Sequence, residues 1–216
     1  FITTVNSNEA TDILKAEPYY VPQMPFGGTE DFIFSNDSKT LLYVCKKKAG
    51  KAYAQSTNTD LYAYDIASGK TSNWTEGMMG YDNHPEFSPD GKYLAWTSMA
   101  RDGFEADKID IVLLDLKTLK KTNLTAGWDE TVDGGFIWAK DSKTIFFNAA
   151  YRGTTQLFSL NIGKPNAVKQ ITNGQWDIAG VHAQTTNGVL VSRTDFNHAA
   201  ELYQVNTKNG AMNQLT

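Results

Sequence analysis

Short segments in which apolar and polar positions alternate recur along the whole chain. The segment "EFSPDGKYLAWTS" (86–98) joins two of them around an Asp-Gly pair. Related copies are "IFSNDSKTLLYVC" (33–45), "IWAKDSKTIFFNA" (137–149) and a weaker "VHAQTTNGVLVSR" (181–193). Alternation with a period of two is typical of half-buried strands, and Asp-Gly is a strong signal for a tight hairpin. Each copy therefore predicts two antiparallel strands and the turn between them.

A second pattern follows each of these hairpins. Its copies are "TDLYAYDIASGK" (59–70), "IDIVLLDLKTLK" (109–120), "TQLFSLNIGKP" (155–165) and "AELYQVNTKNG" (200–210). Each copy leads through a polar turn to a short strand that closes on a threonine, at Thr75, Thr125, Thr172 and Thr216. A unit of four short strands has the size and content of one β-propeller blade. The sequence thus predicts an all-β fold, a β-propeller segment of about four and a half four-stranded antiparallel blades.

The repeat sets the expected boundaries within one propeller domain. We expect the last strands of a preceding blade in residues 1–16, and then four blades in 17–77, 78–127, 128–174 and 175–216. An unclosed propeller leaves exposed strand edges, which favours membership of a larger ring. The alternative is a free-standing four-bladed ring in which residues 1–14 pair with the last blade.

Composition and charge narrow the classes of partner. The net charge of -4 gives no basic footprint for nucleic acid, and no apolar run approaches the ~20 residues that a membrane helix needs. The single Cys45 lies in an apolar run, where a buried thiol is expected. We therefore predict neither a nucleic-acid partner nor a membrane partner.

Candidate chemistry lies in the connections whose length varies between units, because binding residues concentrate on the variable loops of a regular scaffold. These connections include residues 46–58 and 99–108, whereas "KKK" at 46–48 is expected to be a solvated hairpin tip. The candidate substrate-binding residues are Glu30, Tyr81, Arg101, Glu105 and Arg152. No GxSxG motif and no metal-ligand spacing of histidines occurs, so we assign no catalytic residue and no metal ligand.

Several longer stretches carry a family resemblance. "DILKAEPYYVPQMPFGGTEDFIFSNDSK", "KKAGKAYAQSTNTDLYAYD", "EGMMGYDNHPEFSPDGKYLAWTSMARDGFEAD" and "ITNGQWD" resemble the second half of the propeller of dipeptidyl peptidase V type enzymes, in the prolyl oligopeptidase family of serine peptidases. The resemblance covers nearly the whole chain. The run from "GYDNHPEFSPDGK" to "SMARDGFEAD" is its most specific part, since SPDGK alone recurs in many propellers.

The resemblance implies a two-domain exopeptidase that releases dipeptides and needs no cofactor. Its propeller would gate access and recognise the free N-terminus of a peptide, with Glu30 and Glu105 as candidate partners of the ammonium group. The expected partners are the peptide substrate, the protein's own α/β-hydrolase domain, which these residues lack, and a second copy in a homodimer of the full-length protein. The resemblance also implies a periplasmic or secreted location. The rival interpretation is a non-enzymatic, TolB-like propeller that binds a protein partner.

Overall fold

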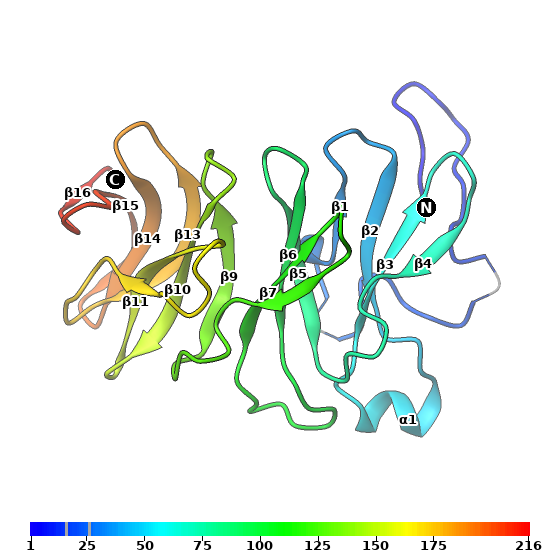
Figure 1. Ribbon diagram of the computed structural model, residues 1–216, viewed down its shortest axis with the longest axis horizontal. Coiled ribbons are helices and arrows are strands. Elements are labelled where there is room, and N and C mark those ends of the chain that lie inside the picture. Colours follow the sequence, from blue (N-terminus) through cyan, green and yellow to red (C-terminus); the bar gives the residue numbers. More distant parts are fainter. Residues whose placement is uncertain (16, 26) are drawn as a thin grey trace. The chain divides into compact units, whose positions relative to one another are not determined.

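The strands of the chain form four four-stranded antiparallel sheets, each built from consecutive strands (Figure 1). The computed structural model describes residues 1–15, 17–25 and 27–216. Four antiparallel strands joined by short connections are the content of a propeller blade. The predicted fold class, an all-β propeller segment, is confirmed.

The strand bounds follow the two repeated patterns. The first sheet contains β1 (Phe32–Phe34), β2 (Thr40–Cys45), β3 (Asp60–Asp65) and β4 (Thr71–Asn73). The second contains β5 (Asp82–Phe87), β6 (Tyr93–Ser98), β7 (Asp110–Asp115) and β8 (Lys121–Asn123). The third contains β9 (Val132–Trp138), β10 (Thr144–Tyr151), β11 (Thr154–Asn161) and β12 (Lys169–Gln170). The fourth contains β13 (Asp177–Gln184), β14 (Val189–Asp195), β15 (His198–Val205) and β16 (Met212–Gln214).

The chain divides into two compact units. The first comprises Phe1–Pro85 and Met99–Asp107, and the second comprises Glu86–Ser98 and Lys108–Thr216. The connection between β6 and β7 therefore belongs to the first unit, although both strands belong to the second. This connection contributes to the site described below.

Each unit has its own apolar core. In the first unit, Tyr43 and Tyr62 stack on one face of the first sheet, and Ile2 and Ile13 pack against the same cluster. In the second unit, an aromatic cluster is built around the stacked rings of Phe147 and Phe158. These faces consist of alternate strand residues, as the period of two predicts.

The N-terminal segment pairs with itself only briefly. Ile2 and Thr11 form an isolated antiparallel bridge, with hydrogen bonds of 2.8 Å in both directions. The sequence predicts the last strands of a blade over residues 1–16, and the described part of that range contains this bridge and no longer strand.

The first hairpin turn of three units has the same backbone conformation. Gly91 has a φ of +68°, and the equivalent Ser38 and Ser142 have φ values of +59° and +56°. The Asp90 carboxylate accepts the Lys92 N–H, as the Asp37 carboxylate accepts the Lys39 N–H. Left-handed backbone is why Gly is favoured here. Asp37-Ser38 and Asp141-Ser142 therefore form the same kind of turn as Asp90-Gly91.

The closing threonines share one hydrogen-bond arrangement. The Thr125 hydroxyl accepts the N–H of Ile111 (3.0 Å) and donates to the Asp110 carboxylate (2.7 Å). Thr75, Thr172 and Thr216 likewise accept the N–H of Leu61, Leu157 and Leu202, and donate to Asp60, Gln156 and Glu201. Each threonine thus links the end of a unit to its third strand.

Substitution of Thr125 by valine is expected to lower the free energy of unfolding by ~1.5 kcal/mol, since valine keeps the shape and leaves the buried Ile111 N–H unpaired. Urea denaturation followed by tryptophan fluorescence measures this change. Thr216→Val is the matched control, because it removes the same two bonds at an exposed position where water replaces them. Equal losses in the two variants would contradict this account of the motif.

The connection between β2 and β3 differs from its prediction. The sequence predicts a variable loop over 46–58, with residues 46–48 as a solvated tip, but Gly50–Gln55 forms helix α1 (Figure 1). No side chain of the described residues caps the N-terminus of α1, and none of the helix residues is buried. So short a helix has little intrinsic stability, and its contacts with neighbouring segments must hold it.

Candidate functional site: a pocket bounded by four connections

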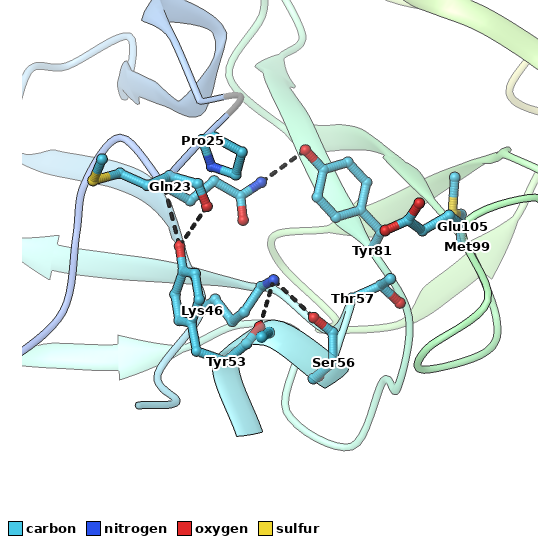
Figure 2. Close-up of a pocket in the computed structure, with 11 residues that line it drawn as sticks. Gln23, Pro25, Lys46, Tyr53, Ser56, Thr57, Tyr81, Met99 and Glu105 are labelled. Atoms are coloured by element: carbon cyan, nitrogen blue, oxygen red, sulfur yellow. Dashed lines mark hydrogen bonds between the residues drawn. The ribbon is translucent and has the colours of Figure 1, made fainter. Parts of the chain in front are cut away.

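Four connections of the first unit surround a pocket of about 520 Å³ (Figure 2). The lining residues are Gln23, Met24 and Pro25 before β1, Lys46, Tyr53, Ala54, Ser56 and Thr57 between β2 and β3, Tyr81 before β5, and Met99 and Glu105 between β6 and β7. Most of the lining is apolar, and two charged side chains, Lys46 and Glu105, interrupt it. Ligand pockets commonly have this size and this mixture of groups.

Lys46 holds the C-terminal end of α1. Its ammonium group donates to the carbonyl oxygens of Ser56 (2.7 Å) and Tyr53 (3.3 Å), and it lies 4.5 Å from the centre of the Tyr53 ring. Burial lowers the pKa of Lys46. A cation beside the last carbonyls of a helix is a favourable arrangement. The expectation of a solvated tip is therefore wrong for Lys46, because the free carbonyls of α1 bind its charge.

Three hydrogen bonds that involve side chains join α1, the segment before β1 and Tyr81. The Tyr53 hydroxyl donates to the Met24 carbonyl (2.7 Å) and accepts the Met24 N–H (3.1 Å). The amide of Gln23 donates to the Tyr81 hydroxyl over 2.7 Å, as Figure 2 shows. Burial raises the pKa of Tyr81, and the carboxylates of Asp31 and Glu30 raise it further. Tyr81 is therefore a neutral phenol at one wall of the pocket.

The backbone around Tyr81 is held from two sides. The Thr59 N–H donates to the Gly80 carbonyl, and the Met99 N–H donates to the Tyr81 carbonyl (3.0 Å). The buried Thr59 hydroxyl donates to the Asp82 carbonyl and accepts the Asp82 N–H. These bonds fix where the Tyr81 side chain enters the pocket.

A buried carboxyl group lies beneath the segment before β1. Asp31 is 1% exposed, and its Oδ2 has no hydrogen-bond partner among the described residues. A side chain at Gly27 would overlap this oxygen and the Gln23 backbone, so glycine lets the turn close over the carboxyl group. Burial raises the pKa of Asp31 to about 6, against the hydrogen bond of the Gln23 backbone.

The connection between β6 and β7 brings Met99 and Glu105 to the pocket. Within it, the Asp107 carboxylate accepts the N–H groups of Ala100 and Arg101 and pairs with the Arg101 guanidinium (2.6 Å). Glu105 is exposed and forms no hydrogen bond or ion pair with the part of the chain that the structure describes. Its carboxylate is therefore available to a ligand.

The candidates from the sequence have different places. Tyr81 and Glu105 line the pocket, and Glu30, in the 3-10 turn Thr29–Asp31, lies close enough for its charge to act on Tyr81. Arg101 is bound to Asp107 and lies outside the lining. Arg152 is exposed in the hairpin between β10 and β11, in the second unit, whereas every lining residue belongs to the first.

Sequence reasoning missed Gln23, Tyr53 and Asp102. Tyr53 lies in a segment without an obvious helical pattern, so its direction could not be read from the sequence. Asp102 stands among several charged residues in "RDGFEAD", and only the Asp-Gly pair marks it as a turn residue. Among the described residues, no group of three or more His, Cys, Asp or Glu side chains could hold a metal, and no helix is long and apolar enough to cross a membrane.

The curated proteins that this chain resembles include dipeptidyl-peptidase 5 proteins. No protein-family model matches the chain. A dipeptidyl-peptidase 5 of Porphyromonas gingivalis is 44% identical over 205 residues, which are 95% of this chain and 30% of that protein. A dipeptidyl-peptidase 5 of Porphyromonas endodontalis is 39% identical over 208 residues, 96% of this chain and 30% of that protein. The chain thus spans about 30% of the length of these relatives.

Solved structures share the fold at low sequence identity. A puromycin hydrolase matches 86% of this chain with 30% of its own, at a TM-score of 0.67 and 13% identity. The β-propeller domain of the Trilobed protease from Pyrococcus furiosus matches over 86% of this chain and 51% of its own length, with a TM-score of 0.60 and 16% sequence identity. TolB from Acinetobacter baumannii matches over 88% of this chain and 45% of its own length, with a TM-score of 0.56 and 19% sequence identity. Identities this low show the fold alone, which enzymes and TolB share.

Proposed function

We propose, because this chain is a homologue of the dipeptidyl-peptidase 5 proteins over almost its whole length, that it is a substrate-selecting propeller part of a serine dipeptidyl peptidase. We place the nucleophile in an α/β-hydrolase domain of the longer protein, since these residues contain no GxSxG motif. The exported location and the homodimer expected from the family resemblance stay predictions.

The observation that carries the proposal, besides the homology, is the charge pattern of the pocket. Two carbonyl oxygens occupy the Lys46 ammonium group, whereas the carboxylate of Glu105 forms no hydrogen bond or ion pair with the described residues and acts on Lys46 through its charge alone. A carboxylate beside apolar walls suits the ammonium group of a peptide N-terminus, because charge-assisted hydrogen bonds are the strong ones. Met24, Pro25 and Met99 would contact an apolar side chain near that terminus.

Two neutral variants test which carboxylate binds the amine. In the full-length protein, Glu105→Gln is expected to lower kcat/KM for a dipeptidyl arylamide with a free amine by about tenfold, the effect of one charged hydrogen bond. Hydrolysis of the same substrate after N-acetylation should be unchanged, because that substrate carries no charge for Glu105 to bind. Glu30→Gln tests the second candidate in the same way, and the exposed Glu76→Gln, outside the lining, is the control.

The outcome separates the proposal from its rival. Dipeptide release that a serine-directed fluorophosphonate abolishes, with a specific loss in one of the two variants, would support amine recognition by the propeller. A full-length protein that releases no dipeptide, or equal kinetics in all variants, would contradict it. A stable complex with a protein partner and no hydrolysis would favour the TolB-like interpretation.

A further inference from the structure

Asp102 connects two walls of the pocket without lining it. Its Oδ1 accepts hydrogen bonds from the Ser56 hydroxyl (2.6 Å), the Thr57 N–H (2.8 Å) and the Asn58 N–H (3.1 Å). Its Oδ2 lies 3.5 Å from the Lys48 ammonium group. The Asp102 carboxylate thus binds the three residues that follow α1 and also Lys48, which precedes α1.

The contact continues on both sides of Asp102. The Gly103 N–H donates to the Thr57 hydroxyl (2.9 Å), so the turn at 102–103 is bound by side chain and backbone. Gly103 has a φ of +74°, which lets the chain reverse at this point. A longer hydrogen bond, 3.5 Å, runs from the Thr57 hydroxyl to the Arg101 carbonyl.

The two joined segments carry pocket residues. Ser56 and Thr57 belong to the lining on one side, and Met99 and Glu105 flank Asp102 on the other. We propose that Asp102 is a positioning residue that holds the Glu105 loop against residues 56–58 and so sets the place of the Glu105 carboxylate in the pocket. The role in peptide selection rests on the proposed function, whereas the tie between the two segments does not.

The chemistry of the contact favours a carboxylate. Three donors converge on one oxygen, and an ionised oxygen binds donors about twice as strongly as a neutral one. The hydrogen bond from Ser56, with those from Asn58 and Thr57, holds the pKa of Asp102 below its usual value. The contact is therefore complete at neutral pH, when peptides carry a protonated N-terminus.

Hydrogen exchange of the full-length protein tests the tie directly. In Asp102→Ala, the amides of Thr57, Asn58 and Gly103 should exchange at least about tenfold faster, because their acceptors are lost or displaced. Asp102→Asn keeps an oxygen for the same donors but loses its charge, so its exchange rates should lie between those of the wild type and those of Asp102→Ala. Asp65→Ala is the matched control, since Asp65 accepts the Ser68 N–H in a turn of the same unit outside the pocket.

Kinetics of the same variants test the positioning role. Asp102→Ala should raise KM for a free-amine dipeptidyl arylamide about fivefold with kcat within twofold, because a displaced Glu105 weakens binding and leaves the chemical step intact. Asp102→Asn should restore KM, and Asp65→Ala should not change it. Faster exchange without a change in KM, or unchanged exchange, would overturn the proposal. Unchanged KM in both Asp102→Ala and Glu105→Gln, with faster exchange in the former, would overturn amine recognition by this pocket as well.

Discussion

Replacement of Gly80 by alanine is expected to lower the free energy of unfolding by about 3 kcal/mol, the upper part of the range for overpacking. A methyl group on Gly80 would overlap the carbonyl oxygen and carbon of Met99. These are backbone atoms, so no side-chain rotation can relieve the overlap. The backbone at Gly80 must move away from the backbone at Met99, and the hydrogen bond from the Met99 N–H to the Tyr81 carbonyl should then be lost. Urea denaturation gives the first effect, and faster hydrogen exchange at the Met99 amide gives the second.

The matched control is Gly77→Ala in the same connection. Gly77 has a φ of +85° and no atom within 4 Å of an added methyl group, so alanine there meets backbone strain and no overlap. We expect it to cost about 1 kcal/mol, the usual penalty for left-handed backbone. A Gly80 variant no less stable than the Gly77 variant would contradict the close approach of residues 80 and 99.

Asp31→Asn is expected to stabilise the chain by about 2 kcal/mol at pH 8 and to have almost no effect at pH 4.5. The pKa of Asp31 is raised from 3.8 to about 6 in the folded chain. The folded chain therefore binds more protons than the unfolded chain between pH 4 and 6, and its stability falls as the pH rises through that window. A shift of this size corresponds to on the order of 3 kcal/mol above pH 6. Asparagine carries no charge, so the Asp31→Asn variant does not lose this stability as the pH rises.

Unfolding in urea at a series of pH values measures this difference. Other aspartates act in the opposite direction, because hydrogen bonds in turns lower the pKa of Asp65, Asp90 and Asp115. Their contribution is present above about pH 4 and is lost as the pH falls through their folded-state values. The wild type should thus lose more stability than the variant between pH 5 and 8. A parallel pH dependence of the two proteins would contradict a buried, ionised Asp31.

The fold was predictable because the same pattern of strands and turns occurs in four units of the sequence. The strand Tyr93–Ser98 follows an Asp-Gly turn, and the strands Thr40–Cys45 and Thr144–Tyr151 follow the equivalent turns of their own units. Period, turn residue and closing threonine all indicate the same unit, and agreement between such levels is what specifies a fold. Helix α1 was not predictable in this way, because contacts with other segments hold it. The hydroxyl of Tyr53, in α1, bonds to Met24, and Lys46, outside α1, donates to the Tyr53 carbonyl.

The pocket was predictable only in part. Variable connections indicate where ligands bind, and Tyr81 and Glu105 do line the pocket. Sequence alone could not show that Asp102 turns to Ser56, because Ser56 lies more than 40 residues before Asp102, beyond the reach of any local pattern.

The hydrogen bonds of the closing threonines bear on how the repeated units diverged. The donor is threonine in all four units, whereas the acceptor is Asp60, Asp110, Gln156 or Glu201. Any of these side-chain oxygens can accept from a hydroxyl, but the threonine position must also accept a strand N–H. After duplication, the acceptor could change without disturbing the sheet, and the donor could not. In chains descended from the same ancestor, substitutions should therefore accumulate faster at the acceptor than at the threonine.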